Sequence, residues 1–137
     1  MKVPRRLSRD GVVRKEFQVH SRMNKDILFL LQPGFHDGDA GPFFCPDCAS
    51  LRGVIGFYPR LEEELEIRIV DFARPRLDLR PFTGESAETC PVLILSSPSP
   101  ARLEGIDVQV HHGHRFINEP DRIVTYPARA YRIGLPH

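Results

Sequence analysis

The strongest constraint on the fold is the order of elements that residues 27–72 indicate. Residues 27–31 (ILFLL) form a short, continuously apolar run, which is typical of a strand buried on both faces. From Pro46 onward the apolar residues recur with the period of a helix, and residues 67–72 (IRIVDF) have the β-branched content of a second strand. A strand, a helix and a strand in this order predict a βαβ unit and hence an α/β fold.

The rest of the chain indicates three more strands and one more helix. We expect strands at residues 92–95, 106–111 and 114–117, the last two in a hairpin that turns at His112-Gly113. Asn118 is expected to cap a final helix that begins near Glu119-Pro120. The segments between the elements are expected to be a glycine-containing loop at 34–42, an irregular helix interrupted at Pro81 in 75–84, and a polar, proline-rich loop at 96–105.

The predicted helix begins with Cys45-Pro46-Asp47-Cys48. Two cysteines at positions i and i+3 of a first helical turn have their sulfurs within bonding reach. Cys45 stands at the N-cap end, where unpaired N–H groups and the helix dipole favour a thiolate, which lowers a cysteine pKa from about 8.5 to between roughly 3.5 and 7.5. Asp47 competes for the same positive potential, so we expect Cys45 in the upper part of that range and a reducing dithiol couple.

A single CxxC is also half of a zinc site, and zinc needs two further ligands. No second CxxC and no HxxxH occurs, and the remaining candidates for ligands are Cys90, His36, His111, His112 and His114. Alternate residues of a hairpin point to opposite faces, so we expect exposed hairpin histidines at 111, 112 and 114 and not ligands. The redox reading is favoured over a metal site or an inert pair, and no cofactor is expected.

Five segments together resemble the thioredoxin/glutaredoxin superfamily: LFLLQPG, FFCPDC, EIRIVDF, TCPVLIL and HRFIN followed by a helix. The resemblance covers about residues 26–137 and is closest to a branch of short bacterial thioredoxin-like proteins of unknown function. It implies a mixed sheet of four to five strands flanked by helices. It also implies that Cys45 is the exposed nucleophile, that Cys48 is the resolving thiol, and that Pro91 is the cis-proline beside the disulfide. A trans proline at the first position of a strand is the alternative for Pro91.

The resemblance implies a thiol–disulfide oxidoreductase whose substrate is a disulfide-bearing protein or a small thiol. The substrate-binding residues would be those around the two catalytic cysteines, namely Phe44, Pro46, Asp47, Thr89, Cys90 and Pro91. Two alternatives stay open: a non-catalytic thioredoxin-like binding module or redox sensor, and a metal or iron–sulfur site that uses Cys45, Cys48 and Cys90.

The sequence departs from the thioredoxin pattern at four places. The loop at residues 36–39 is longer, Phe44 replaces a tryptophan, and residues 96–105 are an insertion. Cys90, beside Pro91, adds a third sulfur near the other two. We consider an alternative disulfide, a bond to substrate, a third metal ligand, or a small buried apolar side chain for Cys90.

Charge separates the first 25 residues from the rest. They carry eight Lys or Arg against two acidic residues, whereas the whole chain of 137 residues has a net charge of only +1. We expect a solvated basic extension at 1–25, and not a nucleic-acid-binding tail, followed by one domain at 26–137. No apolar run approaches the roughly 18 residues that span a bilayer, and no secretory signal is recognisable, so we expect a cytoplasmic protein without a membrane partner.

Overall fold

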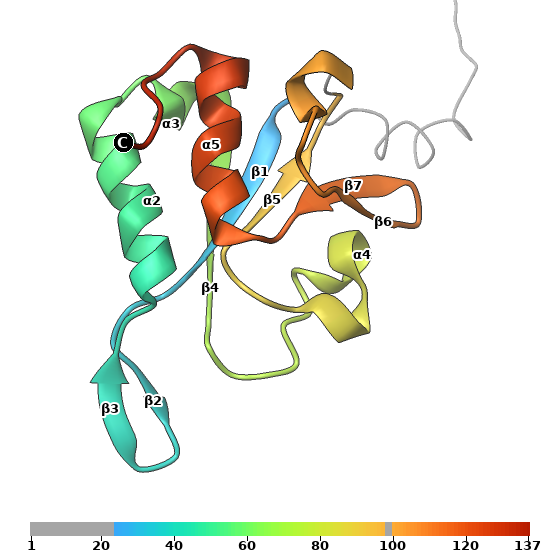
Figure 1. The fold of residues 1–137 in the computed structure, drawn as a ribbon. Coiled ribbons are helices and arrows are strands. Elements are labelled where there is room, and N and C mark those ends of the chain that lie inside the picture. The colour runs from blue at the N-terminus through green and yellow to red at the C-terminus, as the bar shows by residue number, and fades with distance from the viewer. Residues whose placement is uncertain (1–23, 98–99) are drawn as a thin grey trace, which may run out of the picture.

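The computed structural model describes residues 24–97 and 100–137, which form a five-stranded mixed sheet with helices on its faces and a two-stranded hairpin that projects beyond it (Figure 1). In chain order the elements are β1 (Asp26–Leu31), β2 (Phe35–Asp37), β3 (Ala40–Phe43), α2 (Pro46–Phe57), α3 (Leu61–Glu64), β4 (Leu65–Val70), α4 (Arg80–Thr83), β5 (Val92–Leu95), β6 (Gln109–His111), β7 (His114–Ile117) and α5 (Pro120–Tyr131). The predicted fold class, a mixed α/β sheet flanked by helices, is confirmed.

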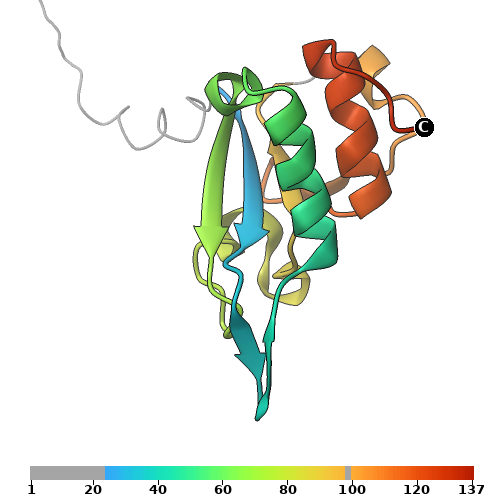
Figure 2. The same cartoon turned by 90° about the vertical axis from the view of Figure 1, so that its left-hand side faces the viewer.

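The five strands lie in the order β4-β1-β5-β7-β6. β1 and β4 are parallel and are joined by α2, which makes them the predicted βαβ unit. The other pairs, β1 with β5, β5 with β7 and β7 with β6, are antiparallel. β4 is therefore an edge strand, and Figure 2 shows it at the border of the sheet with α2 and α5 on one side.

β1 is apolar on both faces because both faces are covered. Leu28 and Leu30 pack into the larger core, under α2, α3 and α5, whereas Ile27 and Phe29 pack into the smaller core, against Leu79 at the start of α4. The buried helical residues of the larger core are Cys48, Leu51, Ile55, Leu61, Ile123 and Tyr126. A strand with both faces in a core gives the uninterrupted apolar run that predicted it.

α2 forms as its sequence indicates. Pro46 stands in the first turn, where its missing N–H removes one orphan donor. Leu51 and Ile55 are buried one turn apart, with Val54 and Tyr58 half-buried beside them. This single apolar face fixes the rotation of the helix over β1 and β4, and so fixes where its N-terminus lies.

Several predicted elements differ from the structure. β4 covers Leu65–Val70, so it begins directly after the single turn of α3 and ends two residues before the predicted end at 72. The expected loop at 34–42 contains the hairpin of β2 and β3. Pro81 stands in the first turn of α4 and does not interrupt a helix. Glu119, and not Asn118, occupies the N-cap position of α5, and its side chain makes no capping bond.

The predicted hairpin turn at His112-Gly113 is present between β6 and β7, although β6 itself covers only Gln109–His111. Both turn residues have positive φ, 47° for His112 and 82° for Gly113. Two successive positive φ angles match the twist of the flanking strands, as in a type I′ hairpin turn.

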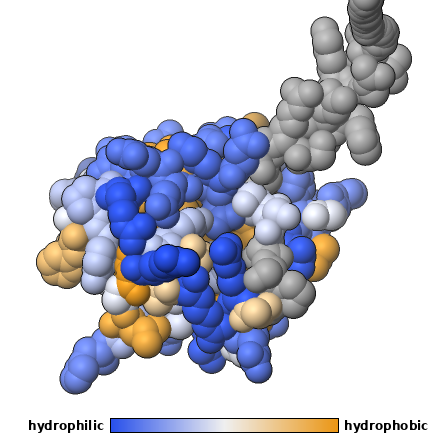
Figure 3. Space-filling view, turned by 90° about the horizontal axis from the view of Figure 1, so that it is seen from above, coloured by the Kyte–Doolittle hydropathy of each residue, from blue (hydrophilic) through white to orange (hydrophobic). Residues whose placement is uncertain are grey.

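At the other end of the sheet, where β1 begins, a polar cluster closes the domain. Asp26 is buried, and its carboxylate accepts hydrogen bonds from the backbone N–H of Ser96 at 2.7 Å, from the Ser96 hydroxyl at 2.9 Å, and from the Tyr131 hydroxyl. Burial, reinforced by Asp26, raises the pKa of Tyr131. These bonds join β1, the segment after β5 and α5. Figure 3 shows this end from outside as a mainly hydrophilic surface with small hydrophobic patches.

Among the described residues, no helix has the length and apolar character that a membrane span requires. The predicted basic extension lies, up to residue 23, outside the described residues and stays a prediction.

Gly53→Ala is expected to stabilise the protein by about 0.5–1 kcal/mol, because Gly53 lies inside α2 and a methyl group there meets no atom within 4 Å. Urea unfolding measures this change. Gly34→Ala is the matched control and should be destabilising by about 1 kcal/mol or more, because Gly34 has φ +85°. A lower unfolding midpoint for Gly53→Ala would contradict the described helix.

Candidate functional site

Cys45 caps the N-terminus of α2. Its backbone is extended, with φ −81° and ψ 114°, and its Sγ accepts a hydrogen bond from the backbone N–H of Cys48 at 3.2 Å. The sulfur thus satisfies one of the N–H groups that the first helical turn leaves without a partner. The structure places the motif where the sequence predicted it, at the junction between the β1–β3 segment and α2.

Cys48 lies directly behind Cys45. It is only 4% exposed, and its Sγ accepts a hydrogen bond at 3.5 Å from the backbone N–H of Leu31, the last residue of β1. Burial, and then the hydrogen bond with Cys45, raise the pKa of Cys48 to about 12. Cys48 is therefore a protonated thiol near neutral pH, held against the sulfur of Cys45.

Cys45 is half-buried and lines a groove of about 770 Å³ between α2 and the β1–β4 pair. Phe44 stands on the groove next to Cys45 and is 62% exposed. Ile67 and Ile69 of β4 line the same groove, because the edge strand has no neighbour on its outer side. A molecule that reaches the Cys45 sulfur from solvent thus meets a largely apolar surface.

Cys90 lies, like Cys45 and Cys48, near the carboxyl end of β1, but it precedes β5 and not α2. β5 pairs with β1 so that Val92 is opposite Phe29, and Cys90 precedes Val92 by two residues. Cys90 is half-buried and packs on the same core as Cys45. Burial raises the pKa of Cys90 to about 11, although Arg76 lowers it. The peptide bond between Cys90 and Pro91 is cis.

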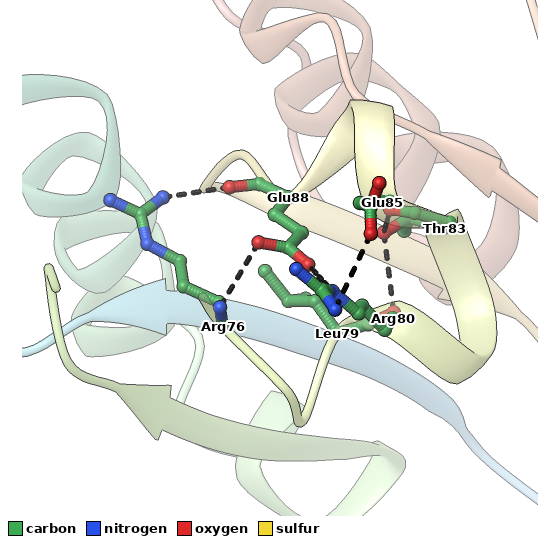
Figure 4. A network of polar contacts seen from close by, with 7 residues as sticks. Arg76, Leu79, Arg80, Thr83, Glu85 and Glu88 are labelled. Atoms are coloured by element: carbon green, nitrogen blue, oxygen red, sulfur yellow. Dashed lines mark hydrogen bonds and ion pairs between the residues drawn. The ribbon is translucent and has the colours of Figure 1, made fainter. Parts of the chain in front are cut away.

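Arg76 is a site residue that the sequence analysis missed. Its side chain is buried, and Nε and Nη2 donate to the carbonyl oxygen of Phe72 at 3.0 and 2.7 Å. Nη1 donates to the carbonyl oxygen of Glu88 at 2.8 Å (Figure 4). These partners are neutral main-chain groups, which do not neutralise the guanidinium charge. Burial, and then the charge of Arg74, lower the pKa of Arg76, whereas negative charge on Cys90, Glu88 or Cys45 raises it.

Glu88 holds the segment that carries Arg76. Its buried carboxylate accepts a hydrogen bond from the backbone N–H of Arg76 at 3.0 Å and pairs with the Arg80 guanidinium (Figure 4). Both contacts lower the pKa of Glu88, the bond from Arg76 most. Because Cys90 follows Glu88 by two residues, this network fixes the approach of the chain to β5.

The other predicted substrate-binding residues lie near the three sulfurs and differ in exposure. Phe44, Pro46 and Asp47 surround Cys45 on the surface, and Thr89 is exposed beside Cys90. Pro91 is buried at the start of β5. The structure thus brings the predicted set to one end of the domain.

The three hairpin histidines, His111, His112 and His114, lie on β6, the turn and β7. His112 is exposed, as predicted, whereas His111 and His114 are half-buried. The rings of His111 and His112 lie 4.2 Å apart, and that of His114 packs 4.9 Å from Phe82. Within residues 24–97 and 100–137, no group of three or more His, Cys, Asp or Glu is arranged to hold a metal ion.

Residues 25–136 match a family model described as "Protein of unknown function (DUF3088)". The match covers most of the chain, so the chain belongs to this family. Searches of curated proteins and of solved structures found no match. The family is not described as thioredoxin-like, and that resemblance stays a prediction.

Replacing Arg76 should change the reactivity of Cys90. In a background with Cys45→Ser and Cys48→Ser, Arg76→Gln is expected to slow alkylation of Cys90 by iodoacetamide about three- to tenfold at constant pH. The loss of the positive charge raises the pKa of this thiol and lowers its thiolate fraction. Mass spectrometry of the alkylated protein gives the rate.

Arg76→Lys is the matched control, because it keeps the charge but loses the planar fork of donors. It should alkylate at nearly the original rate. Equal slowing in both variants would mean that Arg76 acts on Cys90 only by holding the loop.

Proposed function

We propose that this member of the DUF3088 family is a thiol–disulfide oxidoreductase with a thioredoxin-like fold, in which Cys45 is the nucleophile and Cys48 the resolving thiol. One observation carries the proposal: a half-exposed sulfur caps α2 while a second, buried thiol lies against it. This arrangement gives the two sulfurs different access to a substrate and direct access to each other.

The fold supports the thioredoxin-like resemblance. The chain runs through a parallel βαβ unit with the CPDC motif at its first junction, then through Cys90-Pro91 into antiparallel β5, a hairpin and a final helix. This is the order of segments on which the resemblance rests. Fold alone does not establish an activity, so the function depends on the sulfurs.

In the first step, the Cys45 thiolate attacks one sulfur of a substrate disulfide. The substrate S–S bond breaks, one substrate sulfur leaves as a thiolate, and the other is bound to Cys45 as a mixed disulfide. The N–H of Cys48 and the N-terminal end of the α2 dipole stabilise the attacking thiolate. The apolar groove beside Cys45 receives the substrate.

In the second step, the Cys48 thiol loses its proton and attacks the Cys45 sulfur. A Cys45–Cys48 disulfide forms and the second substrate thiolate leaves, so the substrate gains the two electrons that the protein dithiol loses. An external dithiol regenerates the protein. Negative charge on Cys45 is one cause of the high Cys48 pKa, and the mixed disulfide removes that charge. Cys48 therefore ionises more readily once substrate is bound.

A variant with only Cys45 left should trap the intermediate. Cys48→Ser/Cys90→Ser is expected to form a stable mixed disulfide with insulin, because no second thiol can release it, and intact-mass spectrometry without reductant detects it. Cys45→Ser/Cys90→Ser keeps one thiol as well, but a buried one, and should form no adduct. Absence of an adduct in the first variant, or equal adducts in both, would favour a non-catalytic module.

Phe44 should contribute to substrate binding. Phe44→Ala is expected to raise KM for insulin about three- to tenfold with little change in kcat, because loss of an aromatic contact worth about 1 kcal/mol weakens binding. Phe57→Ala is the matched control, since Phe57 is 83% exposed at the opposite end of α2. The role of Phe44 is refuted if both variants behave alike.

A further inference from the structure

Cys90 is placed as a second partner for Cys45. Continuing the antiparallel register of β1 and β5 by two residues puts Cys90 opposite Leu31. The N–H of Leu31 contacts the Sγ of Cys48, which in turn lies against Cys45. The last residue of β1 is thus flanked by two thiols that come from different elements, α2 and the segment before β5.

The two thiols differ in access. Cys48 is almost completely covered, whereas Cys90 is half-buried, as Cys45 is. All three sulfurs pack on the larger core, and the charges of Cys45 and Cys90 influence each other. Cys45 therefore has one thiol in its own helical turn and a second one, Cys90, that packs on the same core from the β5 side.

Cys90 also has a cation beside it. Arg76 favours the ionised form of Cys90. The Arg76 guanidinium donates a hydrogen bond to the carbonyl oxygen of Glu88, which precedes Cys90 by two residues. A buried cation whose hydrogen bonds go to neutral carbonyl groups gains from a neighbouring anion. The ionised form of Cys48 is assisted instead by the backbone N–H of Leu31.

We propose that Cys90 is a second resolving thiol, which rests on the proposed function of Cys45 as the nucleophile. The Cys90 thiol loses its proton to solvent, its thiolate attacks the Cys45 sulfur of the mixed disulfide, and the substrate sulfur leaves with the bonding electron pair. The product is a Cys45–Cys90 disulfide. Attack of Cys48 on Cys45 then gives the Cys45–Cys48 disulfide and frees Cys90 as a thiol. The substrate gains two electrons by either route.

The test compares Cys48→Ser, which keeps Cys90, with Cys48→Ser/Cys90→Ser. Each is reacted with insulin and digested with trypsin without reductant. Cys45 lies in the tryptic peptide 26–52 and Cys90 in the peptide 77–102, because trypsin does not cut before Pro81. A Cys45–Cys90 disulfide therefore joins two peptides, whereas a Cys45–Cys48 disulfide lies within one.

We expect Cys48→Ser to yield the joined peptides and at least tenfold less insulin adduct than the double variant. Equal, persistent adduct in both variants without joined peptides would overturn the role of Cys90 and leave Cys45 as the nucleophile. Absence of adduct in the double variant and of joined peptides in Cys48→Ser would overturn both proposals. Cys48→Ser/Cys90→Ala provides the same comparison if serine at position 90 impairs folding, which circular dichroism shows.

Discussion

β1 pairs with β4 in parallel and with β5 in the antiparallel direction, and the positions of the three cysteines follow from these two pairings. The chain leaves β1 at its carboxyl end and enters α2 near that same end. It enters β5 there as well, because β5 runs the opposite way. Cys45 and Cys48 on one path and Cys90 on the other therefore meet at the end of β1, although the second path arrives more than forty residues later.

The sequence predicts those strands and helices whose apolar pattern reflects burial against a core. The run at 27–31 and the periodic face of α2 reflect contacts with a core, and both were located. The β2–β3 hairpin was missed because its residues are mostly exposed and contain turn formers, so no alternation of burial marks it. Asn118 is a good capping residue, but α5 begins at Pro120, two residues after it, so Glu119 occupies the cap position.

The candidate site was predictable only where its chemistry is local. The spacing of Cys45 and Cys48 indicates a pair on a helical turn without any knowledge of the rest. Arg76 has no such signal. It is buried, unlike Arg74, and its backbone N–H and guanidinium donate hydrogen bonds to Glu88, twelve residues later, while the guanidinium also donates to the carbonyl oxygen of Phe72. A buried cation is thus created by tertiary structure, and sequence patterns do not report it.

The Arg76–Glu88 network has a defined dependence on pH. The folded-state pKa of Glu88 is lowered, so its stabilising contribution is complete above the unfolded-state pKa and is lost as the pH falls through the folded value. Near neutral pH the carboxylate is charged and the loop before β5 is held in place. Under these conditions Cys48 and Cys90 are both protonated, because burial raises the pKa of each thiol. In the mechanism that we propose, Cys45 carries the substrate as a mixed disulfide and bears no negative charge, so the charge that opposes ionisation of Cys48 and Cys90 is absent at the second step.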